Sequence, residues 1–224
     1  MSRGYNKYFE QRTLLHPFGN INPKDAPKTT LSNGNYEIPI LKQVSELDLY
    51  NPKIQKIKRG GCIPFTYIDN KLYVCFGKYR DTGELTDFGG CKKSNENIIQ
   101  CAVREFNEET RCAFGMFNKD IVNDCNCLYN SEMLIILVYI DVNESEKLNI
   151  LELTRNNFEN GANIPFYENL SHRKYTEISE LAWFNIKTID IKNLQIFKKV
   201  KRFLLSSNII DESNIIKILC INEN

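Results

Sequence analysis

The chain has 224 residues, of which 42% are hydrophobic and 25% are charged, and its formal net charge at pH 7 is +1. This composition is that of a globular protein and excludes an intrinsically disordered chain. The length suits one domain with an appendage, or two small domains. Because the net charge is close to zero, it argues neither for nor against a nucleic-acid partner, and any electrostatic argument must be local.

Export and membrane insertion are not expected. The N-terminal stretch MSRGYNKYFEQRTLLHPF lacks the apolar core of a secretory signal. The most apolar run, Met133 to Val142, is about half as long as a membrane span and indicates a buried strand. The eight cysteines are scattered without a Cys-x-x-Cys pair, so we expect reduced, mostly buried thiols, no zinc site and a cytoplasmic location.

Residues 1–56 are polar and rich in proline, which predicts an N-terminal arm or extension with a short helix near Val44 to Leu49. Residues 57–224 are predicted to form the folded domain. It begins with two strand-like runs, Gly61 to Ile68 and Lys71 to Gly77, separated by a hairpin turn at Asp69-Asn70. A further short run, Leu85 to Phe88, leads into the pair Gly89-Gly90.

The segment from Glu96 to Thr110 has helical periodicity, with Ser94 or Asn95 as its expected N-cap. Three glutamates of this helix, Glu105, Glu108 and Glu109, follow the i, i+3, i+4 spacing, so their carboxylates point to one side. We call these three residues the carboxylate cluster. Like charges this close repel one another, and a hard divalent cation is the natural way to neutralise them.

The remaining elements follow in chain order. A buried strand is expected over Met133 to Val142, a long loop over 143–172, and another strand over Leu181 to Phe184. An amphipathic helix is predicted over Leu194 to Leu205, within a basic C-terminal segment, 190–206. A terminal strand or short helix is predicted over Ile215 to Ile221. Strands and helices that mix without strict alternation favour a layered α/β fold.

The segment that begins at Gly89 resembles the box of the Nudix hydrolase family, G-x5-E-x7-R-E-U-x-E-E-x-G-U, where U is a bulky apolar residue. Six positions match a single prescribed residue type, and the chance of this in about 200 windows is roughly 10⁻⁵. The resemblance covers about residues 58–206. The matching residues are Gly90, Glu96, Arg104, Glu105, Phe106, Glu108, Glu109 and, at the final apolar position, Cys112.

The resemblance implies a Nudix α/β/α sandwich with a mixed β-sheet, in which the box forms a loop-helix-loop. It also implies an enzyme dependent on Mg²⁺ or Mn²⁺, with the carboxylate cluster and the Gly89 carbonyl as metal ligands. Glu105 and Glu109 are the expected catalytic carboxylates, and Arg104 is placed to orient a glutamate through charge-assisted hydrogen bonds. Glu105 is favoured as general base, with Glu132, Glu177 and Glu180 as alternatives.

The implied reaction is attack of water on a P–O–P bridge in a nucleoside diphosphate linked to another group. Candidate substrates are a nucleoside triphosphate, a nucleotide sugar, a dinucleoside polyphosphate and the 5′ cap of RNA. An inactive nucleotide-binding module is less expected, because the carboxylates are intact. The capped-RNA alternative is based on the basic residues between Lys187 and Arg202 and on a second basic run, Lys53 to Arg59.

Three residues outside the box are candidate substrate contacts. Arg80 and Lys78 could bind a phosphate, although each could equally be an ordinary exposed charge of the hairpin. Trp183 could stack on a base, but a strand tryptophan beside Phe184 is more often part of the core. His172 lies beside Arg173 and Lys174 and is expected to be a loop residue.

One position departs from the box. Arg111 stands where the family has a glycine, which typically ends the helix with a positive φ. That backbone conformation costs a non-glycine residue on the order of 1 kcal/mol. The helix is therefore expected to run on or to end differently, toward Gly115. The oligomeric state is not predicted from the sequence.

Overall fold

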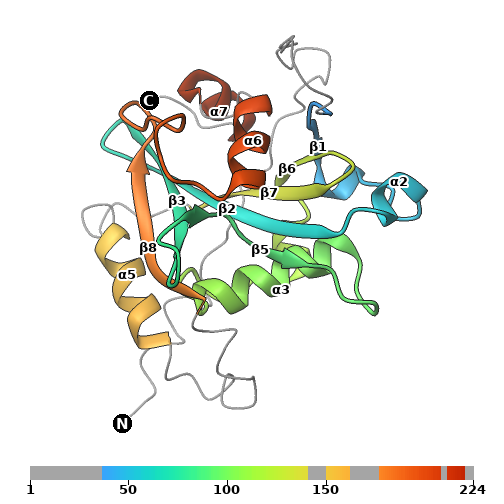
Figure 1. Ribbon diagram of the computed structural model, residues 1–224, viewed down its shortest axis with the longest axis horizontal. Coiled ribbons are helices and arrows are strands. Elements are labelled where there is room, and N and C mark those ends of the chain that lie inside the picture. The colour runs from blue at the N-terminus through green and yellow to red at the C-terminus, as the bar shows by residue number, and fades with distance from the viewer. Residues whose placement is uncertain (1–36, 141–149, 162–176, 208–210, 220–224) are drawn as a thin grey trace.

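A computed structural model describes residues 37–140, 150–161, 177–207 and 211–219 (Figure 1). The strands are β1 (Ile40–Gln43), β2 (Arg59–Ile68), β3 (Lys71–Tyr79), β4 (Leu85–Thr86), β5 (Phe88–Cys91), β6 (Asn126–Tyr129), β7 (Met133–Tyr139) and β8 (Ile178–Asn185). The helices are η2 (Val44–Glu46), α2 (Pro52–Gln55), α3 (Ile98–Thr110), α4 (Lys119–Val122), α5 (Ile150–Gly161), α6 (Lys198–Ser207) and α7 (Glu212–Leu219).

The strands form one mixed sheet. Its main path is β1-β6-β7-β2-β3-β4, and β5 and β8 pair with β2 and β3 outside this path. The central pair β2 and β7 is parallel, whereas the other pairs are antiparallel. The predicted hairpin is confirmed, because β2 pairs with β3 and the turn residues Asp69 and Asn70 both have positive φ.

Helices cover both faces of the sheet, with α3 and α5 on one side and α6 and α7 on the other (Figure 1). The central strand β7 explains this arrangement, since its side chains alternate between two buried cores. Leu134 and Ile136 pack on the side of α3, and Ile135 and Leu137 pack on the side of α6 and α7. A strand with apolar residues on both faces must be covered on both faces. The predicted α/β/α sandwich with a mixed sheet is confirmed.

The boundary predicted at residue 56 is wrong for residues 37–56. Strand β1 pairs with β6, and Val44, Leu47 and Ile54 are buried in the same core as α3. These three apolar residues are few among many polar residues and prolines, so the composition of the segment did not indicate that it packs on the core. Residues 1–36 lie outside the described residues. The helix predicted near Val44 to Leu49 is only a short 3-10 turn.

The long loop predicted over 143–172 is also wrong in its middle, which forms helix α5. Thr154 and Phe158 are buried, so tertiary contacts stabilise a helix that the polar composition of this segment did not indicate. The other residues of that range lie outside the described part of the chain, as does His172. Helix α6 begins at Lys198, four residues after the predicted start, and the last apolar segment forms helix α7.

The structure describes seven cysteines, and five of them are buried. Within the described ranges, no helix has the length and apolarity needed to cross a membrane.

Candidate functional site

Helix α3 begins with a capping box that fixes its first turn. The Asn97 side chain accepts hydrogen bonds from the backbone N–H groups of Ile99 and Gln100, at 3.0 and 2.9 Å. The Gln100 side chain in turn accepts from the N–H of Asn97 at 2.9 Å. The N-cap is therefore Asn97 and not the predicted Ser94 or Asn95, because only Asn97 is followed by a glutamine three residues later.

The two sides of α3 have different tasks. Its apolar side, including Ala102 and Phe106, is buried against the sheet. The carboxylate cluster lies along the helix, and both Glu108 and Glu109 are buried, with only 7% and 5% of their surfaces exposed. Buried carboxylates carry a large desolvation penalty unless charge or hydrogen bonds compensate it.

Arg104 supplies part of this compensation. Its guanidinium donates to Glu96 at 2.7 and 2.9 Å, to Glu105 at 2.6 Å and to Glu108 at 3.1 Å. It also donates to the carbonyl of Cys91 at 3.3 Å. Arg104 thus holds two members of the carboxylate cluster, which is the orienting geometry the sequence predicted.

Glu96 anchors Arg104 from the loop before the helix. Its hydrogen bonds with Arg104 lower the pKa of Glu96 to about 2, and the backbone N–H of Lys93 adds to this effect. Glu96 therefore stays ionised at neutral pH and keeps the guanidinium in place. It orients the site from a distance and is not a member of the carboxylate cluster.

Gly90 allows Glu105 to approach the backbone. A Cβ atom at position 90 would lie 2.5 Å from the carboxylate carbon and from one carboxylate oxygen of Glu105. Any side chain at this position would displace that carboxylate. The box glycine is thus required by close packing, and strand β5 forms the wall opposite the helix.

Glu109 is the least compensated member of the carboxylate cluster. Within the described structure its Oε2 atom is buried and has no hydrogen-bond partner. Burial raises the pKa of Glu109 well above its ordinary value, and the carboxylates of Asp87 and Glu105 raise it further. Arg59 and the backbone of Gly89 act in the opposite direction. A buried carboxylate oxygen without a partner, beside other carboxylates, is a site that a cation would stabilise.

A second, partly buried arginine lies behind Gly89. Arg59 forms two parallel hydrogen bonds with Asp87, at 2.6 and 2.7 Å, and also donates to the Gly89 carbonyl at 2.9 Å. This pair is not apparent in the sequence, because Arg59 ends the basic run that begins at Lys53. The available signal was Asp87, a charged residue within the short strand-like run, Leu85 to Phe88, that leads into Gly89-Gly90.

The site residues fit a divalent cation in charge and in ligand type. Five carboxylates (Asp87, Glu96, Glu105, Glu108 and Glu109) lie around two guanidiniums, those of Arg59 and Arg104. Among the described residues, however, no three His, Cys, Asp or Glu side chains converge on one point as they stand. The unpartnered Glu109 oxygen is the observation that favours a cation, and Arg104 binds one oxygen of Glu105 and one of Glu108.

Helix α3 ends at Thr110, so the expectation that it runs on is wrong. Arg111 adopts the left-handed conformation, with φ 53° and ψ 35°, as the glycine it replaces would. Its guanidinium lies 4.0 Å from the centre of the Phe158 ring and donates to the carbonyls of Phe158 and Ile178, each at 3.3 Å. These contacts with α5 and β8 offset the backbone cost.

The three predicted substrate contacts lie on β3, directly after it, and on β8. Lys78 forms an exposed ion pair with Glu180 at 3.4 Å, and Arg80 is exposed at the end of the hairpin. Trp183 packs edge-on against Phe114, 6.0 Å between ring centres, and its indole N–H donates to Thr154 at 3.0 Å. Trp183 thus occupies the packing role that the sequence offered as its alternative.

The segment that leads into α6 reaches the back of the site. Phe197 hydrogen-bonds to the backbone of Leu85, and its ring lies 6.0 Å from the Arg59 guanidinium carbon. The basic residues of α6 begin directly after it. Of these, Lys201 has a structural role, because its ammonium donates to the carbonyls of Lys192 and Leu194.

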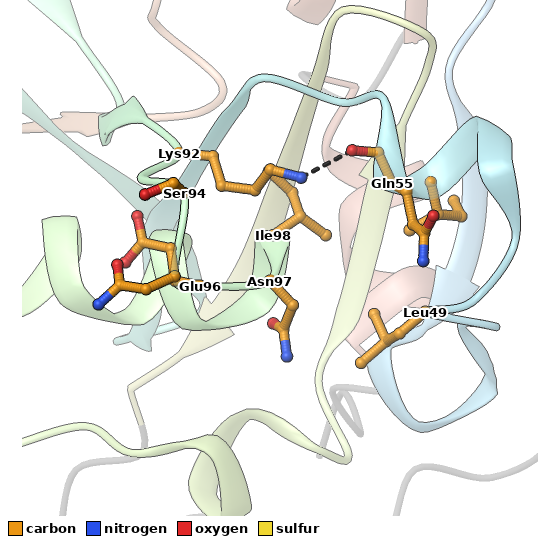
Figure 2. A pocket seen from close by; sticks show the side chains of 9 residues that line it. Leu49, Gln55, Lys92, Ser94, Glu96, Asn97 and Ile98 are labelled. Atoms are coloured by element: carbon orange, nitrogen blue, oxygen red, sulfur yellow. Dashed lines mark hydrogen bonds between the residues drawn. The ribbon is translucent and has the colours of Figure 1, made fainter.

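A cavity of about 510 Å³ lies between α2 and the loop before α3 (Figure 2). Lys92 crosses it and donates to the carbonyl of Gln55 at 2.7 Å. Glu96, the anchor of Arg104, forms part of its wall, so the cavity adjoins the site from outside. Its lining residues are Leu49, Ile54, Gln55, Lys92, Ser94, Asn95, Glu96, Asn97 and Ile98.

No protein-family model matches the chain. It is 36% identical over 72 residues to an uncharacterized protein of Acanthamoeba polyphaga mimivirus, a match that spans 30% of this chain and 23% of that protein. Among solved structures it is similar to a C. elegans Ap4A hydrolase, with a TM-score of 0.39, 15% identity, and coverage of 68% of this chain and 95% of that one.

It is also similar to a Nudix hydrolase from Nitrosomonas europaea, with a TM-score of 0.36, 16% identity and 69% of each chain covered. A MutT/Nudix family protein from Listeria innocua gives a TM-score of 0.37 and 16% identity over 73% of this chain and 96% of that one. At these levels of similarity, the functional assignment depends on the geometry of the carboxylate cluster.

Proposed function

We propose that this protein is a Nudix-type pyrophosphohydrolase that uses water to cleave the P–O–P bond of a nucleoside diphosphate linked to another group. The observation that carries the proposal is the carboxylate cluster packed against Gly89-Gly90, with a buried, unpartnered oxygen on Glu109. Such a cluster binds a hard divalent cation and leaves the opposite side of that ion to substrate phosphates.

In this proposal the carboxylate cluster would hold Mg²⁺ or Mn²⁺, with the Gly89 carbonyl as the further ligand that the box resemblance implies. A divalent cation held there neutralises phosphate charge and acidifies a water molecule. Glu105 is the proposed general base, because its carboxylate lies directly against Gly90. The alternatives Glu132, Glu177 and Glu180 are all exposed, and Glu180 is paired with Lys78.

Arg104 has a separate role. It donates to Glu105 and Glu108 while Glu96 holds it from the loop side. The hydrogen bond from Arg104 would fix the orientation of the Glu105 carboxylate beside Gly90, where it would accept a proton from water. Arg104 therefore orients the base and does not itself need to contact substrate.

A substrate panel tests the proposal. Purified protein with Mg²⁺ or Mn²⁺ is given a nucleoside triphosphate, a nucleotide sugar, Ap4A and capped RNA in ¹⁸O-labelled water, and the products are identified by mass. We expect cation-dependent cleavage of at least one anhydride, with a single ¹⁸O in one phosphate product. A trapped phosphoenzyme would contradict direct attack by water. No cleavage across the panel, with a bound nucleotide instead, would favour the nucleotide-binding module.

Capped RNA is the second candidate, and one observation favours it. Helix α6 presents exposed Lys198, Lys199 and Arg202, and the residue before it, Phe197, contacts Arg59 behind the site. An RNA body could therefore follow α6 while its cap lies at the carboxylate cluster. The counterargument is an ordinary solvated helix face, since Val200, Phe203 and Leu204 form the buried side.

A further inference from the structure

Arg59 and Asp87 form an ion pair that is almost fully removed from solvent. The side chain of Asp87 is 0% exposed and that of Arg59 is 12% exposed, and two hydrogen bonds of 2.6 and 2.7 Å join them. Thr86 donates a further hydrogen bond to Asp87 at 3.1 Å. Arg59 is the first residue of β2, and Asp87 immediately precedes β5. These two strands run antiparallel to each other, and both precede α3 in the chain.

Two facing glycines make room for this pair. Gly61 and Gly89 are partners in the β2–β5 register. A Cβ at Gly61 would lie 2.3 Å from a carboxylate oxygen of Asp87, and a Cβ at Gly89 would lie 2.8 Å from both that oxygen and the Arg59 guanidinium. Three positions on β2 and β5, together with Asp87 between β4 and β5, therefore serve to place one buried charge pair.

The pair also holds the Gly89 peptide from one side. Arg59 donates to the Gly89 carbonyl at 2.9 Å, and the backbone of Gly89 lies close enough to the Glu109 carboxylate to lower its pKa. Gly89 thus links Arg59 to the buried carboxylate of α3. A shift of Arg59 would move this peptide and, with it, the surroundings of Glu109.

Stability alone does not explain such a pair. Taking two charges out of water costs about as much as their attraction returns, and apolar residues of similar volume often stabilise a protein equally well. We infer that Arg59 and Asp87 are a positioning pair for the proposed hydrolysis: they fix the Gly89 peptide beside Glu109 and so set the geometry in which the carboxylate cluster binds its cation. This inference rests on the proposed function.

The experiment compares Asp87→Asn, Arg59→Lys and the apolar double variant Arg59→Met/Asp87→Leu with the wild type. Three quantities are measured: thermal stability, Mn²⁺ affinity by electron paramagnetic resonance, and kcat and KM on the substrate found in the panel. Glu212→Gln is the matched control, because it breaks an ion pair with Lys187 on the surface. It should change none of the three.

The positioning role predicts Mn²⁺ affinity and kcat lower by roughly 10- to 100-fold in each Arg59 or Asp87 variant, with KM changed by less than about threefold. The double variant is decisive. It should recover the thermal stability lost in Asp87→Asn, because no unpaired charge remains, but it should recover neither Mn²⁺ affinity nor kcat.

Recovery of all three quantities in the double variant would overturn the inference and leave the pair a purely structural one. If the wild type binds Mn²⁺ but cleaves nothing in the panel, the proposed function fails, and the positioning pair is still judged by Mn²⁺ affinity. If the wild type binds no Mn²⁺, both proposals are wrong.

Discussion

Single residues in this protein derive their roles from how their charges are compensated. Glu96 and Glu109 are both carboxylates at the same helix, yet Arg104 lowers the pKa of Glu96 to about 2, while burial raises that of Glu109. The same functional group is therefore an anchor in one place and a candidate cation ligand in the other.

Glu109→Gln should lower kcat by roughly 10²–10³-fold, because the amide keeps the shape of the side chain but loses its charge and its affinity for a cation. Circular dichroism should show an unchanged fold. Glu46→Gln, at an exposed position, is the control and should retain activity. Full activity of Glu109→Gln, or of the wild type in excess chelator, would refute the metal hypothesis.

The stability of the cation-free protein should depend on Glu109 in a defined pH range. The folded pKa of Glu109 lies above the ordinary value of 4.5, so the folded state binds the proton more tightly than the unfolded state. Its contribution to stability is complete below 4.5 and is lost as the pH rises through the folded pKa.

Thermal unfolding in chelator, between about pH 4 and pH 8, measures this effect. Glu109→Gln should melt at a higher temperature than the wild type at the upper end of the range, and the difference should disappear at the lower end. Added Mn²⁺ should restore the wild type at high pH. A constant difference across the range would mean that Glu109 does not titrate as its burial requires.

At the scale of elements, the end of α3 shows how contacts can replace a preferred residue. Arg111 accepts a left-handed backbone because its side chain binds α5 and β8. Helix α5 is further attached by hydrogen bonds from Asn157 to Ala113 and from Trp183 to Thr154. Helices α3 and α5 therefore pack together as one unit.

Arg111→Gly should lower the free energy of unfolding by about 1–2 kcal/mol. The glycine would relieve about 1 kcal/mol of backbone cost, but the contact with Phe158 and two hydrogen bonds, together worth about 2–3 kcal/mol, would be lost. Urea denaturation measures the net effect, and hydrogen exchange over 150–161 should rise. A glycine variant more stable than the wild type, with α5 still protected, would show that the contacts contribute little.

At the scale of the whole molecule, the sheet separates two chemically different sides. Helix α3, which carries the carboxylate cluster, packs with α5 on one face, and the basic helix α6 packs on the other (Figure 1). Phe197 joins the two regions, because it contacts Arg59 and packs edge-on against Tyr79. The RNA proposal depends on whether the basic face and the site act on one substrate.

If the basic face and the site act on one substrate, capped RNA should be cleaved at least about tenfold faster than the free cap dinucleotide at low salt. This preference should fall steeply as the salt concentration rises. The triple reversal Lys198→Glu/Lys199→Glu/Arg202→Glu should remove the preference and spare small substrates. Glu212→Gln serves again as the control. Equal rates on both substrates, without salt dependence, would leave a small-molecule pyrophosphohydrolase as the better interpretation.

The sequence alone determined the α/β layering, the hairpin, the glutamate-bearing helix α3 and the position of Arg104 beside its glutamates, because each follows from local spacing along a helix or strand. Only the tertiary structure decided the burial of Arg59 with Asp87, the unpartnered oxygen of Glu109, the helix within the predicted loop and the left-handed Arg111. These depend on contacts between residues tens of positions apart, where burial reverses the meaning of a charge and packing overrides local preference.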